Sequence, residues 1–296
     1  MTGSVHALIQ GVVLGILTGG VYALMASGQT LIFGIMKVVN LAQGALVVLA
    51  AYLSYTLFTS FGLDPLLTIP LTTVIMFGLG VVIQLVFLRP LKREDSAQLS
   101  LLVTFAVALL LEGFMSVVWK TTYRSTNTDY ANSSWTLLGI QFTVVRVIAF
   151  VLSLIALGLL FLLLNRTKFG RAVRATVQNP MSAELLGVES KRVAALGFGL
   201  GAATAAAAGS VYGLLYPFNS GSHYDLISEL LSIVVLGGLG SVGGAVIAAL
   251  IVSTSSAVVA TVFSPTWSSF TFFVILILVL VLRPQGLYGT VERGAL

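Results

Sequence analysis

The sequence predicts an all-α polytopic membrane protein, and three observations lead to this prediction. Of the 296 residues, 57% are hydrophobic and only 8% are charged, whereas soluble domains average about 25% charged residues. Several uncharged runs are long enough for a helix of about 20 residues to span the hydrocarbon core. The alternation that a transmembrane β-barrel requires is absent. We therefore expect one transmembrane domain over residues 1–296.

Six apolar segments before residue 220 are each long enough to span. They cover residues 5–27, 41–60, 66–88, 99–119, 144–164 and 194–216. In the first of them, Gly11, Gly15 and Gly19 are four residues apart, which places them on one helix face and permits close helix packing. Residues 28–40 are shorter and carry Lys37, so we expect a half-helix or re-entrant segment there, with Lys37 as an interfacial anchor or a pathway residue.

The last apolar run, residues 230–282, holds 53 residues without a charge. As one helix it would be about 80 Å long, against a hydrocarbon core of roughly 30 Å. Three crossings fit if one is short or broken, and the break belongs at the glycines between 237 and 244. The total is then about eight full spans plus one or two partial ones. Residues 217–229 are expected to form a short loop.

The distribution of Lys and Arg predicts which loops face the cytoplasm. The 89–95 loop holds three of these residues and the 165–193 loop holds six, whereas 120–143 holds two and 217–229 none. The positive-inside rule places the first two loops in the cytoplasm and makes 120–143 a small extracytoplasmic cap. Because the basic residues cluster in these loops, the net charge of +5 reflects membrane topology and contact with anionic lipid. It does not indicate binding to nucleic acid.

The 165–193 loop contains a short helix that needs a partner. Asn179 is an N-cap, Pro180 occupies the first helical position and Gly187 follows the end. A helix of about seven residues is not stable alone in water, so we expect it to dock on another protein. Met181, Leu185 and Leu186 offer apolar contact to that protein, and Ala183 allows it to approach closely. The predicted docking residues are Asn179, Pro180, Met181, Ala183, Glu184, Leu185, Leu186 and Gly187.

Two interruptions of the apolar pattern indicate a transport pathway. One is the Gly-rich stretch near residue 240, and the other is a polar, Gly-containing stretch near residue 42 that precedes a long apolar segment. Interruptions in corresponding places often mark a substrate route, and simple helix packing is the alternative. The residues concerned are Asn40, Gln43, Gly44, Gly238, Gly240 and Ser241.

Glu112 is an acidic residue inside a predicted span. Intramembrane ionisable residues are candidates for function, so we include Glu112 in the predicted pathway. A structural ion pair, or a position facing a vestibule, is the alternative, because the span ends only about seven residues later.

Other chemistry is not indicated by the sequence. Gly238, Gly240 and Gly243 have the spacing of a dinucleotide fingerprint, but no strand or βαβ unit surrounds them. His6 and His223 have no companions at metal-ligand spacing, so no metal site is expected. No nucleophile–base pair is recognisable, and no lysine lies in a GxxxxGK[ST] context. If the protein uses ATP, another chain binds it.

Four stretches, residues 23–55, 171–188, 231–252 and 283–289, resemble the permease subunits of branched-chain amino-acid-type (LIV-type) ABC importers. Within that family the chain is most similar to the smaller of two paired permeases. The resemblance implies a type II ABC importer fold. It also implies a second homologous permease, two ABC ATPase subunits that carry ATP and Mg²⁺, and an extracytoplasmic solute-binding protein. In this family a cytoplasmic coupling helix docks on the ATPase, and 179–188 matches its position.

We therefore expect a multi-pass permease of a bacterial inner membrane that binds no cofactor itself and is not an enzyme. Its cargo would be branched-chain amino acids, or the urea, amides or aromatic acids that related importers carry. The alternative is an ion-coupled secondary transporter. That alternative predicts acidic residues in several spans, and the sequence indicates only Glu112.

Overall fold

The computed structural model describes residues 2–91, 96–128, 130, 133–137 and 140–289, and it confirms an all-α polytopic fold. Within these residues, eight helices are long and apolar enough to cross a membrane. They are α1 (Thr2–Met36), α2 (Gln43–Phe61), α3 (Pro65–Ile83), α4 (Ser96–Trp119), α5 (Val144–Arg166), α8 (Ser190–Leu215), α10 (Val242–Val262) and α11 (Ser268–Leu282). Residues 92–95 of the predicted cytoplasmic loop lie outside the described residues.

Within the same described residues, shorter elements join these spans. They are the helices α6 (Lys168–Gln178), α7 (Pro180–Leu185) and α9 (His223–Gly237), a π-helical turn (Gln84–Leu88), two 3-10 turns (Ser220–Ser222 and Pro265–Trp267), and the strands β1 (Ser134–Leu137) and β2 (Ile140–Thr143). The strands pair antiparallel, with Ser134 opposite Thr143. With 15 residues α9 is about 22 Å long, too short to cross alone, whereas α11 forms a span of 18 residues together with the turn Pro265–Trp267 before it.

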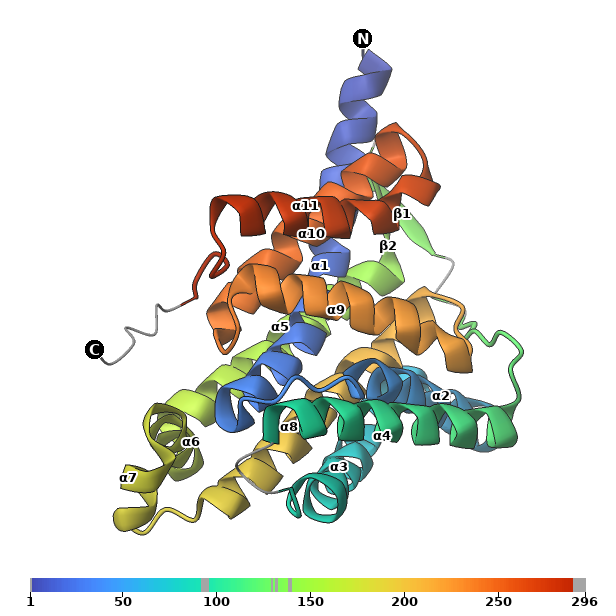
Figure 1. Cartoon of the computed structure of the whole chain (residues 1–296). Coiled ribbons are helices and arrows are strands. Elements are labelled where there is room, and N and C mark those ends of the chain that lie inside the picture. Colours follow the sequence, from blue (N-terminus) through green and yellow to red (C-terminus); the bar gives the residue numbers. More distant parts are fainter. Residues whose placement is uncertain (1, 92–95, 129, 131–132, 138–139, 290–296) are drawn as a thin grey trace.

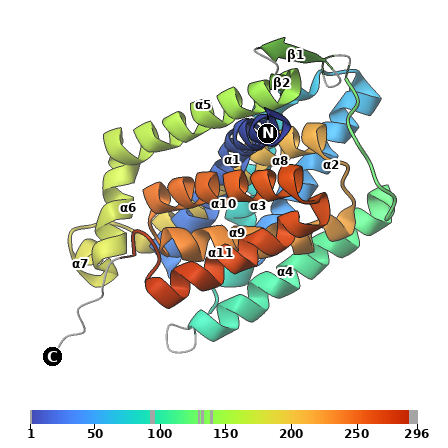
Figure 2. The same ribbon diagram turned by 90° about the horizontal axis from the view of Figure 1, so that it is seen from above.

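Helix α1 runs through the middle of the protein, with α5, α8 and α10 around it (Figures 1 and 2). Its contact with α10 uses the predicted glycine stripe. A Cβ atom on Gly15 would come 2.4 Å from the Cα atom of Thr254, and one on Gly11 would come 2.4 Å from the Oγ1 atom of Thr261. The two backbones can approach this closely only because these positions carry no side chain.

A second layer forms where α8 packs against α2 and α3. The alanines of α8 are buried there, since small side chains let helices pack closely. Tyr52 of α2 is fully buried, stacks on Trp119 at a ring-centroid distance of 4.9 Å, and meets the edge of Phe218. These aromatic contacts bind the middle of α2 to the end of α4 and to the segment after α8.

The predicted half-helix over residues 28–40 is wrong. Helix α1 continues without a break to Met36, because Ile32 and Ile35 pack against Gly201 and Gly197 of α8. Lys37, with φ +56°, ends the helix in the left-handed region. The segment from Lys37 to Ala42 then leads into α2, so residues 28–40 do not add a crossing.

The predicted break in the last apolar run is confirmed, and the predicted loop before it is only partly right. Gly238 and Gly240 have φ +96° and +86°, so the chain turns between α9 and α10 with backbone angles that glycine adopts readily. Residues 217–229 are not all loop, because α9 begins at His223. Three helices, most of α9 with α10 and α11, share the run 230–282, as its length requires.

The region 120–143 joins two distant parts of the chain. The side chain of Gln10 in α1 forms two hydrogen bonds with the β1–β2 hairpin. Its amide nitrogen donates to the Gln141 carbonyl at 2.8 Å, and its amide oxygen accepts from the Gln141 N–H at 2.9 Å. Arg124 pairs its backbone with Phe218. With 165–193 cytoplasmic by charge, we infer that the amino-terminal end of α1 lies with this hairpin on the extracytoplasmic side (Figure 1).

Candidate transport and coupling sites

The predicted short helix of the basic loop forms as α7. The side-chain oxygen of Asn179 accepts a hydrogen bond from the Ser182 backbone N–H at 3.0 Å, and Pro180 follows it at the first helical position. Ala183 is buried against this chain itself, so it does not face outward as Met181 and Leu185 do, and its predicted contact with a partner stays a prediction. Gly187, with φ +84°, follows the end of the helix. The sequence thus predicts both ends of α7 within one residue.

The outer face of α7 carries large apolar side chains that nothing covers within the described residues. Met181 is 67% exposed, Leu185 85% and Leu186 84%. These three residues, here called the α7 patch, lie in the loop that charge places in water. Two of these uncovered apolar side chains belong to the six-residue helix and the third to its C-cap, an arrangement typical of a docking surface.

Helix α6 fixes α7 to the membrane helices. Its side chain Val173 is buried in a cluster with Ile35 of α1, Leu160 of α5 and Val193 of α8. The guanidinium of Arg174 donates to the Leu164 carbonyl near the end of α5. Helix α7 contacts α6 and α8, so it is joined to α1, α5 and α8 by packed side chains.

The polar interruption before α2 is buried among helices. The Asn40 amide donates to the Gln43 side-chain oxygen at 3.2 Å, and the Gln43 amide donates to the Gly201 carbonyl of α8 at 3.2 Å. A Cβ atom on Gly44 would come 2.6 Å from the His223 carbonyl, so α2 meets α9 closely there. These contacts fasten three helices together. A pathway role for Asn40, Gln43 and Gly44 stays a prediction.

The second interruption lies beside the end of α1. A Cβ atom on Gly240 would lie 3.7 Å from the Cα atom of Gly34, just before α1 ends. The Ser241 hydroxyl accepts from the Gly244 N–H at 3.1 Å and begins α10. Gly238 packs so closely on Gly289 that a Cβ atom would come 2.4 Å from its nitrogen. The second interruption thus lies against the last turn of α1, and its transport role stays a prediction.

Glu112 pairs with the start of α9. Its carboxylate accepts a hydrogen bond from the Tyr224 hydroxyl at 2.8 Å, and the His223 ring nitrogen Nε2 lies 3.8 Å away. His223 itself is buried, with its Nδ1 atom 2.8 Å from the Ser220 carbonyl. Glu112 thus joins α4 to α9, as the structural alternative predicts, and a pathway role for it stays a prediction.

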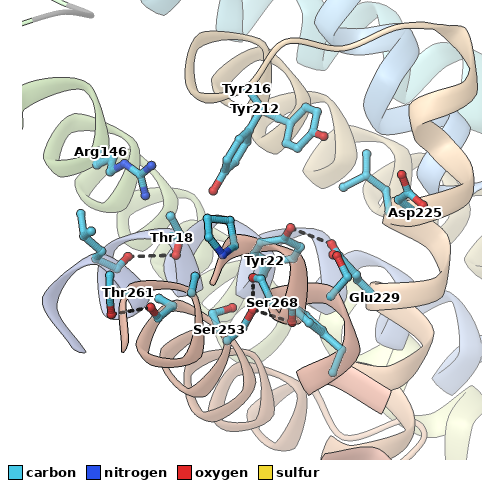
Figure 3. A pocket seen from close by; sticks show the side chains of 18 residues that line it. Thr18, Tyr22, Arg146, Tyr212, Tyr216, Asp225, Glu229, Ser253, Thr261 and Ser268 are labelled. Atoms are coloured by element: carbon cyan, nitrogen blue, oxygen red, sulfur yellow. Dashed lines mark hydrogen bonds between the residues drawn. The ribbon is translucent and has the colours of Figure 1, made fainter. Parts of the chain in front are cut away.

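A polar cavity of about 470 Å³, bounded by α1, α5, α8, α9, α10 and α11, is a feature that sequence reasoning missed (Figure 3). Asp225 and Glu229 of α9 line it, and the Tyr22 hydroxyl donates to the Glu229 carboxylate at 2.7 Å. Glu112 remains the only acidic residue within the eight described spans, but α9 brings two further acids between them. The four-residue spacing of Asp225 and Glu229 was the available signal, since it places both on one helix face.

Residues 11–280 match the family described as the permease component of the branched-chain amino acid transport system. The chain belongs to this family. It is 28% identical to the high-affinity branched-chain amino acid transport system permease protein BraD of Pseudomonas aeruginosa, over 97% of this chain and 98% of that protein. It is 27% identical to the permease protein LivH of Escherichia coli (strain K12), over 94% of each chain.

An archaeal relative extends the comparison. The probable branched-chain amino acid transport permease protein LivH of Methanocaldococcus jannaschii is 28% identical, over 93% of this chain and 90% of that protein. The comparison with solved structures finds no significant match. With its eight membrane-length apolar helices, this permease component is a multi-pass protein of the bacterial inner membrane.

Proposed function

We propose that this permease component serves an ATP-driven importer and forms part of the translocation pathway for branched-chain amino acids. Related small polar solutes, namely urea, amides and aromatic acids, are the other candidate cargoes. The chain itself binds no cofactor. ATP and Mg²⁺ belong to two partner ATPase subunits, a second homologous permease completes the membrane part, and an extracytoplasmic solute-binding protein delivers the cargo.

The observation that carries this proposal is the α7 patch. Met181, Leu185 and Leu186 are largely exposed on a helix whose two ends are fixed by a cap and a glycine. Burying such side chains in a partner's groove gains roughly 1.5–3 kcal/mol for each. A short helix that docks in a groove is a common recognition mode, and it gives an ATPase a mechanical handle on the permease.

The packing beneath α7 supports a coupling role. Through α6 the patch is joined to α1, α5 and α8, so movement of the ATPases would tilt three spans. Switching a permease from about 1% to about 99% outward-facing takes roughly 5.5 kcal/mol of differential binding. Two ATPases acting on two permeases supply this more readily than one short helix does.

The ion-coupled alternative deserves a direct test, because Asp225 and Glu229 place two acids in the cavity between the helices. Uptake of labelled leucine into proteoliposomes that hold the complete complex separates the two mechanisms. The proposal predicts uptake that requires ATP and is inhibited by vanadate. Uptake by this chain without an ATPase, driven by a proton or sodium gradient, would establish the alternative.

A further inference from the structure

The polar cavity holds opposite charges on opposite walls. Arg146, at the start of α5, lines one side, and Asp225 and Glu229 of α9 line the other (Figure 3). Among the described residues, neither acid forms an ion pair with Arg146. Charges held apart within a membrane protein are costly, so such an arrangement indicates a ligand or transport role. A ligand with a positive and a negative end would satisfy both walls at once.

A buried serine in the same cavity lacks a hydrogen-bond partner. Ser253 of α10 lines the cavity and is only 3% exposed, yet its hydroxyl has no partner among the described residues. Its neighbour Ser256 differs, since that hydroxyl donates to the Ser268 carbonyl at 3.0 Å. Buried polar groups are normally paired, so the free Ser253 hydroxyl indicates a group that the cavity receives.

The apolar part of the lining fits a small aliphatic side chain. Six of the 18 lining residues are apolar, namely Leu14, Leu226, Ala257, Ala260, Pro265 and Phe272. A volume of about 470 Å³ lies within the roughly 300–1,000 Å³ of typical small-molecule sites.

We propose that this cavity binds an amino-acid zwitterion with an aliphatic side chain inside a single permease chain. The α-carboxylate faces Arg146, the α-ammonium faces Glu229 and Asp225, and the side chain rests on the apolar lining. The choice of an aliphatic amino acid rests on the proposed function. The dipolar character of the ligand rests on the placement of the charges alone.

Equilibrium binding to the purified complex, without solute-binding protein and in phosphatidylglycerol nanodiscs, tests the site. The probes are L-leucine, isoamylamine, which lacks the carboxylate, and 4-methylpentanoate, which lacks the ammonium. We expect wild type to bind leucine about tenfold or more tightly than either analogue, because each analogue leaves one charged wall unpaired.

Each charged wall of the cavity should determine the preference for leucine over one of the two analogues. Arg146→Gln is expected to remove the advantage of leucine over isoamylamine, and Glu229→Gln its advantage over 4-methylpentanoate. Ser253→Ala, which changes no charge, should weaken leucine binding with both preferences kept. Glu189→Gln is the matched control, because that carboxylate is exposed and belongs to a surface ion pair with Arg192. It should bind as wild type does.

Two results would overturn the site. One is that Arg146→Gln and Glu229→Gln, folded as judged by thermal unfolding, keep the wild-type preferences. The other is that glycerophosphoethanolamine displaces leucine from wild type, which would make the cavity a lipid-headgroup site. Uptake assays on the same preparations keep the two proposals separate. If uptake needs ATP but Arg146→Gln and Glu229→Gln keep the wild-type binding preferences, only the proposed binding site is refuted. If uptake proceeds without ATP, only the proposed ATP-driven importer is refuted.

Discussion

Replacing Leu185 and Leu186 together by aspartate is expected to separate the permease from its ATPase subunits and leave the membrane fold intact. Both side chains are more than four-fifths exposed, so the change removes no packing within the chain. It removes two apolar contacts from the docking surface and adds two carboxylates that would have to lose water on docking. At roughly 1.5–3 kcal/mol for each leucine, the loss corresponds to a weakening of about 10²–10⁴-fold.

Co-purification measures this loss. A tagged variant should elute without its ATPases and hydrolyse no ATP, yet remain monodisperse and unfold at the wild-type temperature. Leu185→Met with Leu186→Met is the matched control, because methionine keeps an apolar side chain of similar volume. The control complex should stay assembled. If the aspartate variant co-purifies like the control, α7 is not the docking helix.

Gly15→Ala is expected to destabilise the permease strongly, because a Cβ atom there would come 2.4 Å from the backbone of Thr254. Backbone cannot rotate aside as a side chain can, so α1 and α10 would have to move apart. Overpacking of this kind costs about 1–3 kcal/mol and sometimes more. Thermal unfolding in detergent should show a clearly lower midpoint and a lower yield of folded protein.

Gly113→Ala provides the matched control for Gly15→Ala. Gly113 lies within α4, and a Cβ atom there would meet nothing within 4 Å. Alanine is the better helix former by about 1 kcal/mol, so this variant should be as stable as wild type or slightly more stable. Equal midpoints for Gly15→Ala and Gly113→Ala would contradict the close contact between α1 and α10.

Local signals let the sequence predict the spans, the glycine stripe and both ends of α7. Each depends on residues within a few positions of one another, such as Asn179 with Pro180. The errors arose where distant packing decides the structure. Lys37 looked like a marker of a separate half-helix, but contacts with α8 keep α1 helical up to Met36.

The polar cavity was out of reach for the same reason. Its defining hydrogen bond joins Tyr22 to Glu229, 207 positions apart. The sequence predicts a loop at Asp225 and Glu229, since charge is rare in spans, and it places Arg146 close to the boundary of a predicted span. Only the folded chain brings Tyr22, Arg146, Asp225 and Glu229 to one cavity, and no short-range sequence pattern predicts that they lie together.

The most direct measurement is a cross-link from α7. The chain contains no cysteine, so Leu186→Cys introduces a single thiol at the exposed end of the helix. A thiol-to-amine cross-linker applied to membranes with the complete complex, followed by mass spectrometry, identifies what lies against it. We predict attachment to a subunit with a nucleotide-binding P-loop, and none from Trp135→Cys on the hairpin. Attachment of both variants to the same partner, or of neither to an ATPase, would contradict coupling through α7.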